Sequence, residues 1–430
     1  MRRYWLSFLP FVLALVVAGC KVTSINYFPP HPAQLRVANL LPGVPAVDVL
    51  IGSNPTWTGV SFQSFTGYVD VENTTQIFTV NIAGTTSQLA QSTFVLAGEQ
   101  PYTLVVTGTP SQPVINVLQE VANIPNNGSA LISAFNGASN QTSLDLYATT
   151  PGVDLTTINP TYYGLNYNGI TYNVSFSPGI YQLRATAANT KTVVYDSGPI
   201  TVTGNAALFF IAYSTGSGVL VNASLLQSKS SAQLLDSTLT RVKTLHAAPQ
   251  TGAVDLQQSG LPIITNVTYS GFGGYVNSPA AASQVMSFVG AGTAAPTLAA
   301  VTATLPSGAD QTVFLTGFPG ALQAVYLADL NLVAAPGGVR VRFVNASPNA
   351  GPLTFTVSGT ATPVVTGLAT PTASSYINLA AGTVTITATD TTTGDTVLTL
   401  PNVVLTSPQT STVYVLGPVG AITGVVTQDF

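Results

Sequence analysis

The stretch RVKTLHAAPQTGAVDLQQ, residues 241–258, aligns without a gap on RVRFVNASPNAGPLTFTV, residues 340–357. Earlier in the chain, RVANLLPGVPAVDVLI (36–51) and LISAFNGASNQTSLDLYA (131–148) follow the same pattern, with a shorter loop in the first. The four copies start about 100 residues apart, which is the size of one small domain. The sequence therefore predicts four tandem repeats of one folded unit.

Each copy is rich in short β-strand patterns. Segments such as 75–84 and 384–400 alternate apolar and polar residues, or carry runs of Val, Ile, Thr and Tyr between turn residues. Seven or eight such strands per copy predict an all-β chain: a tandem array of four immunoglobulin-like antiparallel β-sandwich domains. A β-propeller with two blades per repeat is the alternative, because about 50 residues suit one blade. Only residues 224–239 have a composition that suits a short helix.

The repeat positions divide the chain into predicted domains. A lipoprotein signal peptide covers 1–19, a lipidated cysteine with a proline-rich tether covers 20–34, and the β-sandwich repeats cover 35–128, 129–237, 238–337 and 338–430. Four sandwiches strung in a row would extend beyond ~100 Å, estimated from strand rise and strand length.

The motif shared by the copies resembles a known family. It reads R-V-x-x-x-(H/N)-A-x-P, then V-D-(V/L), then G-Y and a later Y-T-hydrophobic strand. This resembles the bacterial domain of unknown function 4397, which occurs in tandem on secreted and lipid-anchored proteins. Copies one and three carry the motif best, whereas copy two lacks the Arg and the Pro, and copy four lacks the Asp. The resemblance covers nearly all of residues 36–430 and implies an extracytoplasmic immunoglobulin-like sandwich without a known activity.

The N-terminus has the features of a lipoprotein signal. Two arginines precede an uncharged apolar run that ends in Val17, Ala18 and Gly19, directly before Cys20. The run is too short to span a bilayer, which favours a cleaved signal peptide. Its end resembles the bacterial lipobox, which implies that Cys20 carries acyl chains, and Lys21 after it favours an outer-membrane destination. Two or more acyl chains hold a protein on a membrane, so we predict lipid anchoring to the cell envelope.

The composition narrows the range of partners. Charged residues make up 6% of the chain and the formal net charge is −4, whereas ordinary domains contain about 25% charged residues. Without a basic patch, nucleic acid is not an expected partner. The apolar fraction of 46% is enough for several cores and argues against disorder.

The sequence shows no convincing catalytic or metal-binding group. His246 has nearby Asp255, but the equivalent positions in the other copies hold Asn136, Asn345 and, by a rough alignment, Leu41. We interpret His246 as a loop residue that forms hydrogen bonds. We therefore expect no enzyme activity, no cofactor and no metal.

The charged residues that recur are expected to determine the fold. A carboxylate near a strand start can accept N–H groups of the preceding loop, and Thr, which stands in copy four, imitates this weakly. The aligned arginines are expected to pair with acids or loop carbonyls. These fold-motif residues are Asp48, Asp145, Asp255, Arg36, Arg241 and Arg340.

Two functions remain open from the sequence. One is a lipid-anchored, non-enzymatic cell-envelope protein with a structural or interaction role, with a monomer favoured. The other is a glycan or cell-wall polymer binding module that uses exposed aromatic residues of copy two. Core and cross-strand packing also accounts for these aromatics, which are Tyr162, Tyr163, Tyr167 and Tyr172.

Overall fold

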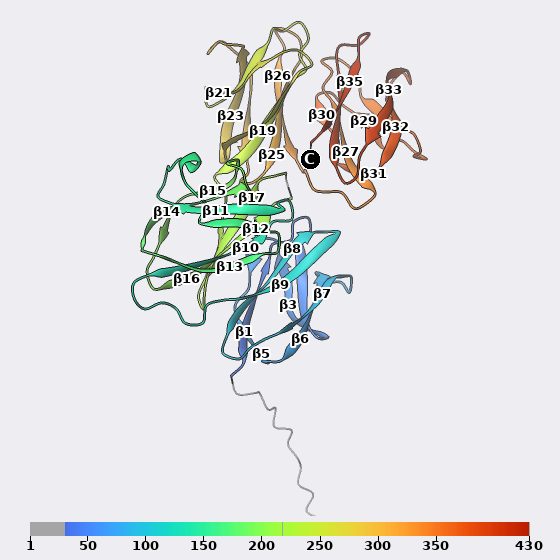
Figure 1. The fold of residues 1–430 in the computed structure, drawn as a ribbon. Coiled ribbons are helices and arrows are strands. Elements are labelled where there is room, and N and C mark those ends of the chain that lie inside the picture. The colour runs from blue at the N-terminus through green and yellow to red at the C-terminus, as the bar shows by residue number, and fades with distance from the viewer. Residues whose placement is uncertain (1–30, 217, 430) are drawn as a thin grey trace, which may run out of the picture.

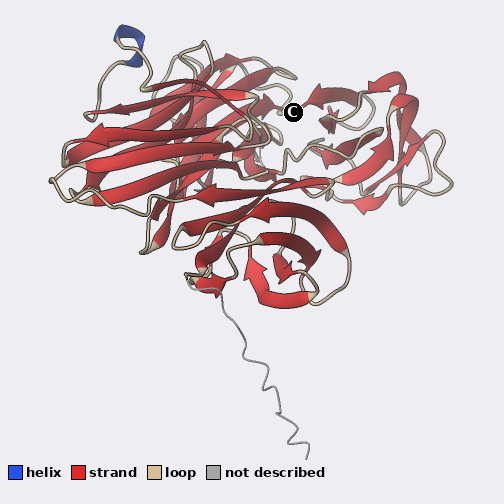
Figure 2. Cartoon of the chain, turned by 60° about the horizontal axis from the view of Figure 1, so that its bottom comes forward, coloured by secondary structure: helices blue, strands red, loops and turns tan. Residues whose placement is uncertain are grey.

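Short strands separated by turns form nearly all of the regular structure. The computed structural model describes residues 31–216 and 218–429. Apart from one 3-10 turn, η1 (Leu155–Thr157), the regular elements of these residues are strands (Figure 2). The strands form eight sheets, two per repeat, which are coloured from blue to red along the chain in Figure 1. The prediction of an all-β chain of tandem β-sandwiches is confirmed.

Repeat 1 contains an inner sheet, which faces repeat 2, and an outer sheet. The inner sheet has the order β4-β1-β8-β9, with β5 also paired to β1, and the outer sheet has the order β3-β2-β6-β7. The strands are β1 (Ala33–Asn39), β2 (Ala46–Ile51), β3 (Asn54–Ser61), β4 (Ser64–Phe65), β5 (Val69–Val71), β6 (Thr75–Ile82), β7 (Gln88–Val95), β8 (Pro101–Thr109) and β9 (Gln112–Gln119).

Repeat 2 repeats this plan, with one strand, β13, in place of β4 and β5 and an additional edge strand, β18, in its inner sheet. The inner order is β13-β10-β16-β17-β18 and the outer order is β12-β11-β14-β15. The strands are β10 (Ala130–Gly137), β11 (Ser143–Thr149), β12 (Tyr162–Asn166), β13 (Ile170–Phe176), β14 (Gly179–Ala187), β15 (Val193–Val202), β16 (Ala206–Ser214), β17 (Val221–Gln227) and β18 (Ala232–Leu235).

Repeat 3 has inner order β22-β19-β25-β26 and outer order β21-β20-β23-β24. Its strands are β19 (Leu239–His246), β20 (Val254–Gln258), β21 (Leu261–Val267), β22 (Phe272–Pro279), β23 (Ala281–Gly290), β24 (Thr297–Leu305), β25 (Asp310–Thr316) and β26 (Gln323–Asp329).

Repeat 4 has inner order β30-β27-β34-β35, with β31 also paired to β27, and outer order β29-β28-β32-β33. Its strands are β27 (Gly338–Asn345), β28 (Leu353–Val357), β29 (Val365–Leu368), β30 (Thr372–Ala373), β31 (Ile377–Ala380), β32 (Gly382–Asp390), β33 (Thr396–Leu405), β34 (Thr410–Leu416) and β35 (Thr423–Gln428).

One ladder in each inner sheet is parallel. The first strand of each repeat runs in the same direction as a later strand, in the pairs β1–β8, β10–β16, β19–β25 and β27–β34. The expectation of antiparallel sandwiches is therefore incomplete. The chain crosses to the outer sheet and back between the two strands, and a connection of this length permits parallel pairing.

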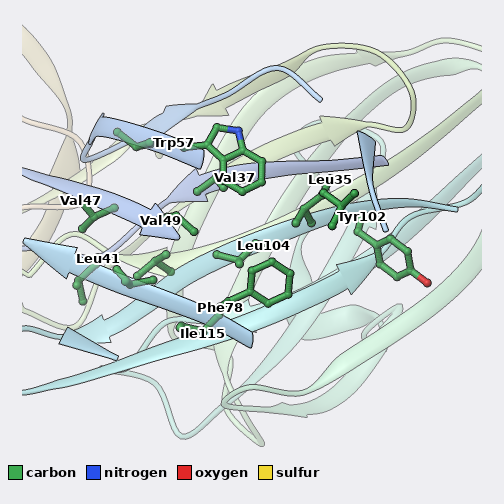
Figure 3. Close-up of a cluster of buried hydrophobic side chains, with 14 of the residues drawn as sticks. Leu35, Val37, Leu41, Val47, Val49, Trp57, Phe78, Tyr102, Leu104 and Ile115 are labelled. Atoms are coloured by element: carbon green, nitrogen blue, oxygen red, sulfur yellow. The ribbon is translucent and has the colours of Figure 1, made fainter. Parts of the chain in front are cut away.

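Apolar side chains that alternate along the strands close each sandwich. In repeat 1, Leu35 and Val37 of the inner sheet pack with Val47 and Val49 of the outer sheet, and Phe78 lies in the same cluster (Figure 3). All five are fully buried. Burial of such a side chain contributes about 1.5–3 kcal/mol. Separate clusters of the same kind fill repeats 2, 3 and 4.

The sandwiches dock in pairs through their inner sheets. Ala38 and Val105 of repeat 1 form one buried cluster with Phe135 and Ile211 of repeat 2. A matching cluster joins repeats 3 and 4. The expected extended row is therefore wrong, and Figure 1 shows two side-by-side pairs instead. The physical reason is that the inner sheets are apolar on both faces and need a partner on the second face.

The segment between β26 and β27, which joins repeat 3 to repeat 4, packs against the first pair of repeats. Leu332 lies between the β1–β2 loop of repeat 1 and the β16–β17 turn of repeat 2, and a Cβ added to Gly216 would lie 2.4 Å from the Leu332 side chain. Thr215 also donates a hydrogen bond to the Gly308 carbonyl of repeat 3, at 2.7 Å. The second pair is thus seated on loops of the first.

Two further expectations fail. The sheets pack as sandwiches and not as blades around an axis, so the propeller alternative is wrong for the described chain. Residues 224–239, expected as a short helix, form most of β17, all of β18 and the start of β19. The β16–β17 ladder, from Leu208↔Gln227 to Ser214↔Val221, fixes this segment as strand despite its helix-compatible composition.

Candidate functional site

The recurring aspartates each hold two separate turns of the backbone. Asp255 accepts a hydrogen bond from the N–H of Asn266 at 2.7 Å on one oxygen and from the N–H of Gly292 at 2.9 Å on the other. Asp48 and Asp145 make the same pair of bonds in their own repeats. The donors are a bulge on the next strand and the following hairpin turn, not the preceding loop that the sequence suggested.

Copy four shows what replaces this carboxylate. Thr354 accepts only one long bond, from the N–H of Gly367 at 3.4 Å, and its hydroxyl lies 3.0 Å from that of Thr391. A hydroxyl has one oxygen where a carboxylate has two, so Thr354 contacts the hairpin turn through the Thr391 hydroxyl and not by accepting a backbone N–H. The side chain at this position of each repeat therefore holds backbone turns in place, and its oxygens are occupied by these contacts.

A second set of charged residues is buried where the inner sheets meet. In repeat 1, Arg36 donates to both carboxylate oxygens of Glu120, at 3.2 and 3.0 Å, and stacks over the ring of Tyr68 at 4.6 Å. Arg36 also donates to the Ser230 carbonyl of repeat 2 at 3.0 Å. Burial, and next the charge of Glu120, raise the pKa of Tyr68 above its ordinary value.

Repeats 3 and 4 exchange the partners of this cluster. Lys243 of repeat 3 pairs with Asp429 of repeat 4, and Arg342 of repeat 4 pairs with Asp329 of repeat 3, the latter at 2.7 Å. Burial alone would raise the pKa of Asp329, but Arg342 and Lys243 lower it below the ordinary value. Tyr275 donates a hydrogen bond to Asp329 at 2.7 Å. The two repeats are therefore joined by reciprocal buried ion pairs.

The structure corrects the register of the aligned arginines. In the parallel ladders Arg36 pairs with Thr103, Lys243 with Thr312 and Arg342 with Thr412. Arg36 thus corresponds to Lys243 and Arg342, and not to Arg241 and Arg340, which stand two residues earlier. The repeated R-V letters produced the wrong match because both positions are basic in copies three and four.

The two remaining arginines lie at the edge of these clusters. Arg241 forms an ion pair with Asp310 at 2.5 Å and also donates through Nε at 2.8 Å. Arg340 donates instead to the carbonyls of Leu330 at 3.0 Å and Leu332 at 3.4 Å. One arginine has an acid and the other has loop carbonyls.

Repeat 2 lacks all three residue types of the ionic cluster in repeat 1. Ser133 stands at the place of Arg36, Asn173 at that of Tyr68 and Ser228 at that of Glu120. Ser228 donates a hydrogen bond to the Val121 carbonyl of repeat 1 at 2.7 Å. On the repeat 2 side of the interface between repeats 1 and 2, small polar side chains therefore form hydrogen bonds in place of the absent charged residues.

Sequence reasoning missed the acids of these clusters. Glu120, Asp329 and Asp429 each follow or end the last strand of the inner sheet, in LQEV, LADL and TQDF. An acid that recurs at the end of three copies is a readable signal in a chain with so few charges.

His246 is the last residue of β19 and not a loop residue as expected, but its ring forms hydrogen bonds as interpreted. It is fully buried, its Nδ1 accepts from the N–H of Ala248 at 3.3 Å, and its Nε2 lies 3.0 Å from the Gly252 carbonyl. Asn39, and not Leu41, takes the equivalent position in repeat 1, with its Oδ1 accepting from the N–H of Leu41 at 3.2 Å.

The aromatic residues of repeat 2 do not form one surface. Tyr162 packs against the core, and its hydroxyl donates to the Ile132 carbonyl at 2.6 Å. Burial raises the pKa of Tyr162 to about 12. Tyr163 is 65% exposed, and Tyr167 lines a cleft of about 430 Å³ together with Pro336 and Pro408. The side chain of Tyr172 lies outside the described part of the structure.

The predicted lipidation site lies outside the described residues, as do Val17, Ala18, Gly19 and Cys20. Within residues 31–216 and 218–429, no three His, Cys, Asp or Glu side chains gather closely enough to hold a metal ion. The same residues contain no helix with the length and apolar character needed to cross a membrane.

A family match covers most of the chain. The profile described as "Domain of unknown function (DUF4397)" matches residues 33–147, 240–356 and 341–430. The chain belongs to the DUF4397 family. The matches leave out 148–239, most of the repeat in which the ionic cluster is missing. No curated protein matches the DUF4397 chain.

Several solved structures are similar to parts of the DUF4397 chain. A family 41 carbohydrate-binding module from streptococcal virulence factors, which recognise alpha-glucan, is 13% identical; the match covers 44% of this chain and 96% of that one, with a TM-score of 0.17. A family 26 module from Eubacterium rectale, in complex with maltoheptaose, is 11% identical over 47% and 95%, with a TM-score of 0.15. The TIE protein of Bacillus anthracis is 8% identical over 88% and 68%, with a TM-score of 0.15. TM-scores this low do not indicate a shared ligand.

Proposed function

We propose that this protein is a non-catalytic, lipid-anchored component of the bacterial cell envelope with a structural or interaction role. The observation that carries the proposal is the use of its scarce charges. Arg36, Lys243 and Arg342 are buried in joints between repeats, each bound to a buried acid. Charges placed in this way hold domains together and are not available to a substrate.

The anchor is attached through Cys20 in this proposal. Acyl chains contribute ~0.8 kcal/mol per buried CH₂, so loss of the acylated cysteine should release the protein from membranes. We expect the wild-type chain to fractionate with membranes and its Cys20→Ala variant to be soluble or retained with an uncleaved signal. Mass spectrometry of the N-terminal peptide checks the modification, and an unmodified Cys20 in membrane-bound protein contradicts it.

The direction in which the array faces decides between two roles. Protease treatment of intact cells should remove the repeats if they are displayed outward, which supports adhesion to external partners. Protection until the outer membrane is opened supports a periplasmic scaffold. A protein that is fully active as a hydrolase on envelope polymers in either case contradicts the non-catalytic proposal.

Glycan or wall-polymer binding by repeat 2 is the second candidate. It is favoured by the exposure of Tyr163 and by the place of Tyr167 in a cleft, since sugars stack on accessible aromatic rings. We expect Tyr163→Ala and Tyr167→Ala to weaken retention on immobilised cell-wall polymers while thermal unfolding stays unchanged. Leu261→Ala, at a 70% exposed site in repeat 3, is the matched control.

A further inference from the structure

A groove of about 490 Å³ lies between repeats 3 and 4, beside the reciprocal ion pairs. Its walls come from the end of β26 on one side and from β27 and the β30–β31 segment on the other. The lining includes Leu327, Leu330, Arg340, Arg342, Ser374 and Tyr376. The volume is within the range of about 300–1,000 Å³ that is typical of small-molecule sites.

Arg340 in this groove has no acidic partner among the described residues. Its equivalent in repeat 3, Arg241, lies opposite Asp310 in the parallel ladder and binds it, whereas Arg340 lies opposite Thr410. Thr410 donates its hydroxyl to the Leu332 carbonyl at 2.8 Å. The guanidinium of Arg340 is therefore held by neutral carbonyls, and its charge is not balanced.

The neighbouring charges do not neutralise Arg340. Asp329 is occupied by Arg342, and Asp429 is occupied by Lys243. Arg340 also stacks on Tyr376, with its Cζ 5.0 Å from the ring centroid, which orients the guanidinium. The cluster thus carries one net positive charge in a chain that is acidic as a whole.

The corresponding groove between repeats 1 and 2 provides an internal comparison. It has about 360 Å³ and is lined by Gln119, Glu120 and Asn173. At the places of Arg340 and Arg342, repeat 2 has Leu131 and Ser133. Of these two equivalent grooves, only the one between repeats 3 and 4 therefore contains the unbalanced positive charge of Arg340.

We propose that the groove between repeats 3 and 4 binds a carboxylate-bearing saccharide, such as a uronic acid unit, through Arg340. A planar guanidinium matches a carboxylate with two parallel hydrogen bonds, and one unbalanced charge suits one carboxylate. Ser375, which is exposed and lines the groove, provides a hydroxyl for the neutral part of a sugar. The inference goes beyond the anchoring and the repeat 2 aromatics and depends on neither.

The test is calorimetric titration of the full chain in detergent micelles with trigalacturonate. Maltotriose, of equal length and without charge, and inorganic phosphate are the comparison ligands. We expect trigalacturonate to bind at least 10-fold more tightly than either, with an affinity that falls as salt is added. Absence of binding, or equal binding of phosphate, overturns the proposal.

Two variants remove the charge by opposite routes. Arg340→Gln deletes the guanidinium, and Thr410→Asp supplies the internal acid that Asp310 supplies to Arg241. Both should weaken trigalacturonate binding at least 10-fold. Circular dichroism and the unfolding temperature verify that each variant is folded. If Arg340→Gln disturbs the segment between β26 and β27, whose carbonyls Arg340 binds, Thr410→Asp still tests the proposal because it keeps Arg340. Wild-type affinity in a folded Thr410→Asp variant overturns the assignment.

Discussion

One carboxylate in each of the first three repeats fixes two turns that are far apart in the sequence. Asp255 reaches Asn266 on one side and Gly292 on the other. Asn266 has a φ of 57° and Gly292 a φ of 72°, so both backbone segments are in the left-handed region, which needs local support. The side chain that the sequence predicted to determine the fold therefore acts as a structural brace.

We expect Asp255→Ala to destabilise repeat 3 by about 2–3 kcal/mol, because two N–H groups lose a charged acceptor in a buried place. Calorimetric unfolding of the full chain measures the shift. Asp70→Ala is the control, since the Asp70 side chain is exposed. Equal unfolding temperatures for the two variants would show that the brace has no energetic importance.

His246 predicts a dependence of stability on pH. Burial lowers its pKa below the ordinary 6.5, and protonation of Nδ1 would break the bond from the Ala248 N–H. The unfolded chain then binds the proton better, so stability is constant above pH ~6.5 and falls as the pH drops below it, by at most ~1.4 kcal/mol per pH unit. His246→Asn, which copies Asn136 and Asn345, should flatten unfolding temperature against pH between 5 and 7. An unchanged slope contradicts this account.

At the residue scale, the sequence identified the right positions but not all of their contacts. The recurrence of Asp48, Asp145 and Asp255 could be read directly because each stands at the same place in the repeated motif. The backbone N–H groups that bind these aspartates could not be predicted, since their positions depend on how three strands pack together. The match of Arg36 with Arg241 was wrong by two residues, because strand side chains repeat every second position and such a shift keeps the same face.

The hairpin between β25 and β26 contains two glycines in the left-handed region of backbone conformation. Gly317, after β25, has a φ of 97°, and a Cβ there would lie 2.4 Å from the Ala321 carbonyl oxygen. Gly320 in the same turn has a φ of 91°, but a Cβ there meets nothing within 4 Å. The hairpin between β25 and β26 thus contains one crowded and one uncrowded glycine.

We expect Gly320→Ala to cost about 1–2 kcal/mol, from the left-handed backbone alone. Gly317→Ala should cost about 1–3 kcal/mol more, because it adds a clash with backbone. Urea unfolding of the two variants measures the difference. Equal costs would show that the hairpin can relax around a methyl group.

At the element scale, strands were predictable where alternation is clear, as in β6 and β32. The parallel ladders were not, because sequence periodicity is the same for both strand directions. Residues 224–239 were misread because Leu, Gln, Lys and Ser suit a helix, while pairing with β16 outweighs that preference.

At the scale of the whole molecule, buried ion pairs hold repeats 3 and 4 together. We expect Arg342→Ala to destabilise this pair by about 3–5 kcal/mol, because Asp329 is left buried without its main partner. Loss of Arg342 removes the largest cause that lowers the pKa of Asp329, so part of the lost stability should be recovered as the pH falls and Asp329 takes up a proton. Differential scanning calorimetry at pH 4.5 and 7 checks both statements.

Ser133→Ala is the comparison for Arg342→Ala, since it changes the equivalent position in the joint of repeats 1 and 2. It removes no charge and should cost less than about 1.5 kcal/mol. A larger effect for Ser133→Ala than for Arg342→Ala would contradict the ranking of the two joints.

The joints were beyond sequence reasoning for a physical reason. Lys243 and Asp429 are 186 residues apart, and each belongs to a different repeat. Comparison of copies shows which positions recur within one repeat but cannot show that repeats exchange partners. The even spacing of the copies favoured a row, whereas the apolar second face of each inner sheet determined the pairing.

The docking of repeats 3 and 4 through their inner sheets also constrains how such a gene can change length. In a repeat that loses its neighbour by recombination, the acid and the base can pair with each other, as Arg36 and Glu120 do within repeat 1, but the apolar second face of the inner sheet is left uncovered. Recombination that deletes or copies both repeats leaves no such uncovered face. The heritable unit of expansion is therefore the pair, and we expect gains and losses in related genes to occur by even numbers of copies.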